Sequence, residues 1–566
     1  MLRAPATTRR NFSAPAFLAT SVALLLILFI RTTRGLDLTD EMQYYGEIKG
    51  LVETGRLFSN DLFIQQSVYI LLYPAFYLYH VIFGFDGLVL FGRLVMSVLS
   101  AGVFAYAYQK LVGLDFARPV ASLTALSLTF AIPYHGIFAP SYNTISQILW
   151  IIFSVRFFEW KRSSVLSWGV LPVIMAFAHP TSALMMTLLI CARLLAEGEI
   201  DRIGKLVLVF LGGALIALPT VLNFALAQDY LTSLNFSSGY GVGTVFFSDV
   251  HQPIYLAGIF AMFGGCVLVW KRLNRFDLSM PMALLLAIAI NLFWRGVTQG
   301  GYSFRVVQLL SLLTALAYVW TLANLPIGDS KARLRIHWLV TFILMFATTL
   351  GITSGNGIGQ ATGAFMIGLP LLLGIAVTSA ASNRILSRSS FIGLVCVALV
   401  SILFASHWSR FAYREDYWWR TSTLIEYVPE FRFISTSSER TNFIYGMQQA
   451  FAKATESKRT LIISNYPALY LALHTIPETC MLYMHSIGSD ISEKTLLECF
   501  EKKSPQIIIN VSGDKDKSSG AARLEATMRN YIIGKGYVCD VGSMKFDSND
   551  NLNPAQLKVS VCKRAA

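Results

Sequence analysis

The sequence predicts a polytopic α-helical membrane protein that carries a C-terminal α/β domain outside the membrane. Of its 566 residues, 54% are apolar and only 14% are charged, whereas soluble proteins carry about 25% charged residues. The apolar residues gather in long runs, and a span needs about 20 of them. The charges lie mostly in the short breaks between these runs. This composition excludes an ordinary soluble enzyme, a disordered chain and a fibrous repeat.

Thirteen apolar runs are candidate membrane spans, a few of them short. One further stretch, 62–84, is ambiguous, because it is rich in Tyr and Phe and carries Gln65, Gln66 and Pro74. Aromatic amphipathic segments prefer the membrane interface, so we expect an interfacial helix there. The thirteen candidate spans are 16–30, 88–110, 118–136, 142–160, 165–178, 180–196, 204–228, 254–271, 279–294, 306–325, 337–352, 364–381 and 390–408.

The basic residues set the expected topology. The chain has 46 Lys and Arg against 33 Asp and Glu, a net charge of +13, which could indicate a nucleic-acid partner. Their position argues against that. With the N-terminus in the cytoplasm and 62–84 not spanning, 19 basic residues fall in inner segments and six in outer ones, as the positive-inside rule requires. If 62–84 spanned, this bias would reverse.

Composition changes near residue 409, which divides the chain in two. We expect a transmembrane domain over 1–409, including a first outer loop over 31–87, and an outer domain over 410–566 of soluble-like composition. Strand-like and helix-like runs alternate in the outer domain, which indicates a small layered sheet. The strand-like runs are 461–464, 506–511, 537–541 and 557–561, and the helix-like runs are 437–456, 491–502 and 519–532.

Four of the seven cysteines lie in this outer domain, where disulfides can form. Cys539 and Cys562 lie on the last two strand-like runs and could pair, leaving Cys480 with Cys499. Free buried thiols are the alternative, and four cysteines allow three pairings. Cys and His do not show the spacing of a zinc site.

The first outer loop carries the most informative motif, the adjacent carboxylates Asp40 and Glu41. A helix starting near Thr39 would use that threonine as its N-cap and place both acids in its first turn. Ordinary helix capping is therefore one interpretation. The loop is also bracketed by a span and an aromatic interfacial segment, which would hold the carboxylates where a lipid headgroup lies.

These residues resemble a family motif. Asp40 and Glu41, followed by Tyr44 and Gly55, are similar to the first-loop motif of the GT-C-fold glycosyltransferases that use lipid-linked sugars, such as the aminoarabinose lipid A transferases and the protein O-mannosyltransferases. In that family an interfacial helix follows, and then a span that opens with Gly-Arg-Leu, here 92–94. The resemblance covers the layout of nearly the whole chain, with its sequence core in 37–160.

The chain departs from the family pattern at several positions. The glutamate often found six residues after the aspartate is at seven, as Glu47, and Asn143 replaces the acid of the second outer loop. A proline pair of the interfacial helix is also missing. These departures leave the sugar, the acceptor and the metal open. A divalent cation such as Mg²⁺ or Mn²⁺ is possible, but losing an acid weakens that case, and we assign no metal ligand.

The resemblance implies an inverting membrane glycosyltransferase. It would move a sugar from a polyprenyl-phosphate donor to a glycolipid, polysaccharide or protein on the outer face, in the inner (plasma) membrane of a bacterium, with the N-terminus cytoplasmic and the C-terminal domain periplasmic or extracellular. Asp40 and Glu41 would be catalytic, with a carboxylate as general base. The candidate substrate-binding residues, including arginines suited to phosphate, are Tyr44, Arg93, Asn143, His179, Arg295 and Arg305.

Other functions remain open on the sequence alone. A transporter or flippase for a lipid-linked glycan would also span the membrane, although paired halves with matching broken helices are typical of transporters, and none are seen. A scaffold or sensor would not need Asp40. A polysaccharide polymerase or ligase would transfer glycans from a diphosphate-linked donor.

Overall fold

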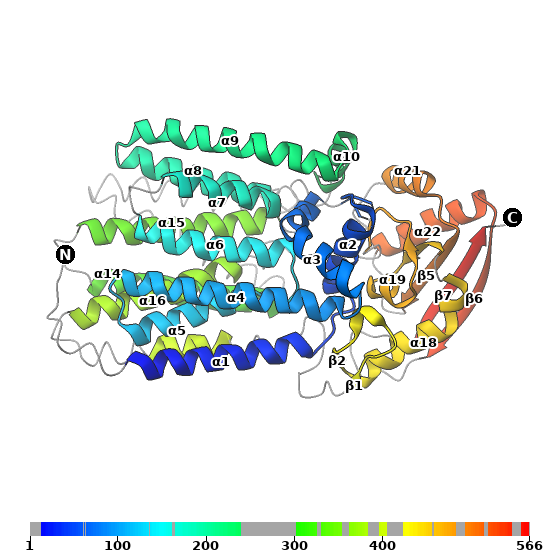
Figure 1. Ribbon diagram of the computed structural model, residues 1–566, viewed down its shortest axis with the longest axis horizontal. Coiled ribbons are helices and arrows are strands. Elements are labelled where there is room, and N and C mark those ends of the chain that lie inside the picture. The colour runs from blue at the N-terminus through cyan, green and yellow to red at the C-terminus, as the bar shows by residue number, and fades with distance from the viewer. Residues whose placement is uncertain are drawn as a thin grey trace.

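The computed structural model shows a bundle of long helices with a sheet-containing domain at one end (Figure 1). It describes residues 13–59, 61–62, 64–134, 136–160, 165–238, 302–324, 330–353, 362–382, 395–404, 423–455, 458–482, 493–513, 519–545 and 556–564. We call the bundle the helical domain and the part from residue 423 onward the C-terminal domain.

The helical domain is built from apolar helices that run along the long axis of the molecule (Figure 1). A further apolar helix, Val395–Phe404, belongs to the same domain. The long helices are α1 (Ser13–Thr33), α4 (Leu88–Gly113), α5 (Arg118–Phe130), α6 (Tyr142–Glu159), α7 (Val165–Ala178), α8 (Pro180–Ala196), α9 (Ile200–Phe224), α14 (Tyr302–Asn324), α15 (Ser330–Thr353) and α16 (Thr362–Ser382).

Length and composition make this a membrane domain. Within the described part of the chain, four helical segments are long and apolar enough to cross a bilayer, and five shorter helices are also apolar. On α9, Leu208 and Leu215 are 69% and 75% exposed. Such a surface would promote aggregation in water but suits contact with lipid. The predicted spans 254–271 and 279–294 lie outside the described residues, so the count of thirteen stays a prediction.

The ambiguous stretch 62–84 folds as a short 3-10 helix, η1 (Ile64–Val68), followed by α3 (Tyr69–Phe83). By length and composition, Gln65–Phe83 is one of the four segments able to cross a membrane. Its place is nevertheless at the end of the bundle, beside α2 (Asp40–Thr54) and facing the C-terminal domain (Figure 1). This position favours the interfacial interpretation, which stays a prediction. The short helix α10 (Ala227–Ser238) lies at the same end.

The C-terminal domain contains a five-stranded mixed sheet in the order β4-β3-β5-β7-β6. Its central strands β3 and β5 are parallel, while β7 runs antiparallel to both β5 and β6. A two-stranded ribbon, β1 (Thr423–Leu424) and β2 (Ser435–Thr436), precedes it. The other elements are α18 (Ser438–Thr455), β3 (Arg459–Ile463), α19 (Ala468–Ala472), β4 (Ile476–Pro477), α21 (Glu493–Lys503), β5 (Ile507–Gly513), α22 (Ser519–Gly534), β6 (Tyr537–Lys545) and β7 (Gln556–Arg564).

Each strand-like and helix-like run expected in this domain corresponds to an element of the structure. The sequence analysis missed β1, β2 and β4, which are only two residues long, and the five-residue helix α19. Both disulfides suggested as one alternative are present, Cys480–Cys499 and Cys539–Cys562, and the second joins residues directly opposite each other on β6 and β7.

One hydrophobic core continues across the junction between the two parts. It includes Leu38 and Met42 from the first outer loop together with Phe431 and Leu469 from the C-terminal domain. The C-terminal domain therefore packs on the first loop as well as on itself. The boundary near residue 409 stays a prediction, because residues 405–422 are not described.

Candidate functional site

The site begins where the chain leaves α1 and turns into α2. Asp37 receives hydrogen bonds from the backbone N–H of Thr39 at Oδ1 (3.1 Å) and from that of Glu41 at Oδ2 (2.9 Å). Thr39 occupies the N-cap position, as expected, but its side chain makes no cap bond to the helix. Its hydroxyl donates to Asp37 instead, at 2.5 Å. The expected Thr39 cap is therefore wrong in detail, because the aspartate two residues earlier satisfies the free helix donors.

Glu41 and Arg93 form a buried ion pair between α2 and α4. Arg93 donates from Nε and Nη2 to the two carboxylate oxygens of Glu41, at 2.8 and 2.7 Å, and both residues are 2% exposed. The same guanidinium donates to the carbonyl of Gly35 (2.7 Å), just beyond the end of α1. These contacts hold α1, α2 and α4 together and favour an architectural role for both residues over contact with substrate.

The glycine before Arg93 leaves room for a side chain of α2. A Cβ added at Gly92 would lie 2.4 Å from the ring of Tyr45, which is fully buried on α2. Tyr45 in turn donates from its hydroxyl to the carbonyl of Val89 on α4 (3.1 Å). Gly92 and Arg93 therefore let α2 pack closely on α4, and this close packing positions the start of α2.

Four of the sequence-predicted residues gather on the other side of α2. Asp40 is half-buried and lies one helical turn before Tyr44, so both share one face of the helix. Asn143, near the start of α6, donates from Nδ2 to the hydroxyl of Tyr44 (3.4 Å). Tyr142 packs edge-on against Tyr44 and stacks on His179, with centroids 6.2 and 6.4 Å apart. We call Asp40, Tyr44, Tyr142, Asn143 and His179 the polar cluster.

Burial and neighbouring charges change the pKa of Tyr44. The pKa of Tyr44 is raised well above its ordinary value, first by burial, then by Tyr142 and by the carboxylate of Asp40. Asp40 and Tyr44 lie one turn apart on the same face of α2, which accounts for the influence of the carboxylate on the phenol. Tyr44 therefore stays protonated and can donate or accept a hydrogen bond beside Asp40.

His179 is the N-cap residue of α8 and is neutral. Its Nδ1 accepts the backbone N–H of Ser182 (3.2 Å), and burial lowers its pKa to about 4. In a neutral imidazole whose Nδ1 is an acceptor, Nε2 carries the proton and is a donor. His179 can thus offer a hydrogen bond to a phosphate oxygen, but without the positive charge of a lysine or an arginine.

The two outer-loop arginines are not placed with this cluster. Arg295 lies outside the described residues. Arg305 falls in the first turns of α14, and the position of its side chain is likewise not described. Their proposed contact with phosphate stays a prediction.

A second pair of carboxylates, Glu47 and Asp61, is buried beside α2, and sequence analysis singled out only Glu47 of the two. Glu47 on α2 accepts hydrogen bonds from Gln43 (3.0 Å) and Tyr69 (2.8 Å), while Asp61 accepts from Gln43 (3.2 Å) and from the backbone of Leu482 in the C-terminal domain (3.2 Å). Both acids are buried. Burial, and then the neighbouring Asp61, raise the pKa of Glu47 well above its ordinary value. Glu47 therefore keeps its proton to a higher pH than a free carboxyl group does.

A divalent cation finds few ligands among the described residues. Within that part of the chain, no group of three or more His, Cys, Asp or Glu side chains is placed to hold a metal ion. The carboxylates of Asp37 and Glu41 already accept hydrogen bonds from backbone amides and from Arg93. The described residues therefore do not fit a metal site.

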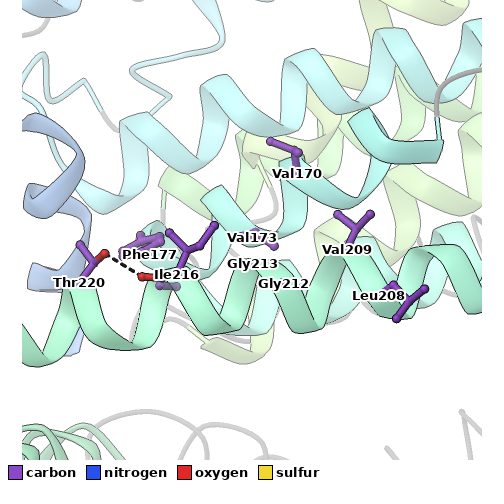
Figure 2. A pocket seen from close by; sticks show the side chains of 10 residues that line it. Val170, Val173, Phe177, Leu208, Val209, Gly212, Gly213, Ile216 and Thr220 are labelled. Atoms are coloured by element: carbon purple, nitrogen blue, oxygen red, sulfur yellow. Dashed lines mark hydrogen bonds between the residues drawn. The ribbon is translucent and has the colours of Figure 1, made fainter.

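An apolar groove runs along the helical domain between α7 and α9 (Figure 2). It encloses about 510 Å³. A Cβ added at Gly213 would lie 2.5 Å from Val173, so this glycine allows the two helices to approach closely. Phe177, which lines one end, is two residues before His179, and the nearby end of α9 contacts the first loop through Leu57 N–H and Phe224 C=O (2.8 Å). The groove therefore ends close to the polar cluster.

Comparisons with known proteins leave the family of the chain open. No known family matches the sequence, and no curated protein matches it. Among solved structures, the archaeal oligosaccharyltransferase AglB from Archaeoglobus fulgidus, in complex with an inhibitory peptide and a dolichol-phosphate, is similar at 10% identity and a TM-score of 0.44, over 87% of this chain and 69% of that one. Membership of the GT-C family therefore rests on the first-loop motif and stays a prediction.

Proposed function

We propose that this protein is a membrane glycosyltransferase that moves a sugar from a polyprenyl-phosphate donor to an acceptor hydroxyl on the outer face of the membrane. The observation that carries the proposal is the polar cluster at the end of an apolar helical domain. In it Asn143 binds the hydroxyl of Tyr44, one turn after Asp40, and Tyr142 contacts the rings of both Tyr44 and His179. Such a position suits a reaction between a lipid-borne donor and a water-borne or lipid-borne acceptor.

In this proposal Asp40 is the general base. The acceptor oxygen attacks the anomeric carbon as the bond from that carbon to the phosphate oxygen breaks, which inverts the configuration. The acceptor proton passes to the Asp40 carboxylate, and polyprenyl phosphate leaves. Nε2–H of His179 donates to an oxygen of the leaving phosphate. Arg295 and Arg305 stay the sequence-predicted source of positive charge for that phosphate. Tyr44 and Asn143 orient the sugar, while Glu41 and Arg93 hold α2 in place.

The groove between α7 and α9 supports a lipid donor over a soluble sugar nucleotide. Its lining is apolar except for Thr220, whose hydroxyl donates to the carbonyl of Ile216 (2.8 Å) and is therefore satisfied within its own helix (Figure 2). A polyprenyl chain lying along it would bring the phosphate toward His179. The groove does not distinguish a monophosphate from a diphosphate donor, so the polymerase or ligase remains the second candidate.

The test of function is a comparison of polyprenyl lipids by mass spectrometry. We expect cells lacking the gene to accumulate one sugar-phosphate polyprenyl lipid, and wild-type protein to remove it. The accumulating mass identifies the sugar and separates a monophosphate from a diphosphate donor. A lipid pool that does not change in the deletion strain would contradict the proposal and favour a transporter or a scaffold.

A further inference from the structure

The loop that carries Asp40 is held from two sides, and one of them is the C-terminal domain. From the helical domain, Arg93 binds the carbonyl of Gly35 and the carboxylate of Glu41. From the C-terminal domain, Arg440 on α18 donates to the carbonyl of Leu36, and the carbonyl of Ser435 accepts the N–H of Gly35 (2.8 Å). The backbone of the residues just before Asp40 is therefore hydrogen-bonded to both domains.

A third contact from the C-terminal domain lies still closer to Asp40. The N–H of Ala468, at the start of α19, donates to the carbonyl of Leu38 (3.2 Å). Between the residues so held lies Asp37, which is 1% exposed and binds the amides of Thr39 and Glu41 on either side of Asp40. A shift of the backbone at 35–38 would therefore move Asp37 and, through it, the peptide units that flank Asp40.

We propose that the C-terminal domain is part of the site and that Arg440 is a positioning residue for Asp40. This inference rests on the proposed function for the role of Asp40. Arg440 is 4% exposed, so its guanidinium is desolvated and its bond to Leu36 is a charge-assisted one in a dry environment. Because a misplacement of about 1 Å at a reacting group can cost about 100-fold in rate, loss of this contact acts on turnover more than on donor affinity.

The test compares three full-length variants by hydrogen exchange and by kinetics. Arg440→Gln removes the charge, and Arg440→Lys retains it on a single nitrogen without the planar guanidinium. Arg432→Gln is the matched control, because Arg432 also links the C-terminal domain to the helical domain, through Asp86, and is 39% exposed at its side chain. Exchange is followed in peptides that contain the amides of Thr39 and Glu41, and transfer is followed by release of polyprenyl phosphate.

We expect Arg440→Gln to raise exchange at these amides by about tenfold or more and to lower kcat by about 10- to 100-fold, with KM for the donor changed less than about threefold. Arg440→Lys should show smaller effects of the same kind, and Arg432→Gln should match wild type. If Arg440→Gln does not fold, exchange and kcat of Arg440→Lys alone test the inference.

Wild-type exchange and kcat in the Arg440 variants would overturn the inference, as would equal changes in Arg432→Gln. A third outcome is faster exchange in Arg440→Gln while the wild-type protein releases no polyprenyl phosphate. In that case Arg440 still positions the loop, but the proposed function is wrong. The two failures are thus distinguishable.

Discussion

Arg93 on α4 donates to both carboxylate oxygens of Glu41 on α2, and both side chains are almost fully buried. The neighbouring Asp40 is half-buried and lies on the face of α2 that meets Asn143 and His179 through Tyr44 and Tyr142. The two adjacent acids of the first loop therefore have different surroundings. We infer that Glu41 maintains the structure and that Asp40 does the chemistry.

The Glu41–Arg93 pair provides the first prediction. Removing one partner leaves the other charge buried and uncompensated, which typically costs about 3–5 kcal/mol. We expect Glu41→Ala to lower the free energy of unfolding by about that amount, and the double variant Glu41→Leu with Arg93→Met to recover most of it. Denaturant titration in detergent measures both. A loss in Glu41→Ala no larger than in the exposed-site variant Glu53→Ala would contradict the architectural role.

Close packing of α2 on α4 provides the second prediction. A methyl group at position 92 would collide with the buried ring of Tyr45, whereas one at Gly102 on the same helix meets nothing within 4 Å. Overpacking of this kind costs about 1–3 kcal/mol. We expect Gly92→Ala to lower the thermal midpoint and Gly102→Ala to leave it unchanged or slightly raised, since alanine favours the helix. Equal midpoints for the two variants would show that Tyr45 can move aside.

The buried carboxyl pair makes stability depend on pH. The pKa of Glu47 is raised above its ordinary value of 4.5 by burial and by Asp61. An acid whose pKa rises on folding stabilises the protein below its unfolded pKa, and this contribution is lost as the pH climbs through the folded pKa.

We therefore expect wild-type stability to fall as the pH rises above 4.5. Glu47→Gln retains the shape of the protonated acid, so its stability should fall less. Thermal midpoints of both proteins at about pH 5 and about pH 8 check this, with the exposed Glu498→Gln as control. Parallel pH curves for wild type and Glu47→Gln would contradict a raised pKa of Glu47 in the folded protein.

The disulfides test the expected topology. Disulfides persist in oxidising compartments, so an outer C-terminal domain predicts that Cys480–Cys499 and Cys539–Cys562 are formed in cells. Peptide mapping after blocking thiols should find both pairs, with Cys191 and Cys396 alkylated as free thiols. Reduction should lower the free energy of unfolding by about 2–4 kcal/mol per bridge. Four reduced cysteines in this domain would place it in the cytoplasm and reverse the topology.

Local patterns in the sequence were enough for most of the elements. The runs over 437–456 and 519–532 correspond to α18 and α22, because apolar periodicity and helix propensity act over a few turns. The sequence did not predict strand β4, because this strand is two residues long and contains Pro477.

The sequence predicted less of the candidate site than of the fold. Of the predicted site residues, Tyr44 and Asn143 are in contact, and their role stays a prediction. The partnership of Glu41 with Arg93 depends on how α2 packs on α4. The contact of Asp61 with Leu482 joins residues far apart in the chain and left no local signature. Asp37 could have been found, since an aspartate just before a helix is a common cap.

Complementation by an Asp40 variant tests the central claim most directly. A strain lacking the gene is supplied with wild type, Asp40→Asn or Glu53→Gln, the last changing a more exposed acid on the same helix. Polyprenyl lipids are compared at equal protein levels. Accumulation of the sugar-phosphate lipid with Asp40→Asn, and its absence with wild type and Glu53→Gln, is the result we predict. Full complementation by Asp40→Asn would contradict the account, because Asp40 would then be only a residue in the first turn of a helix.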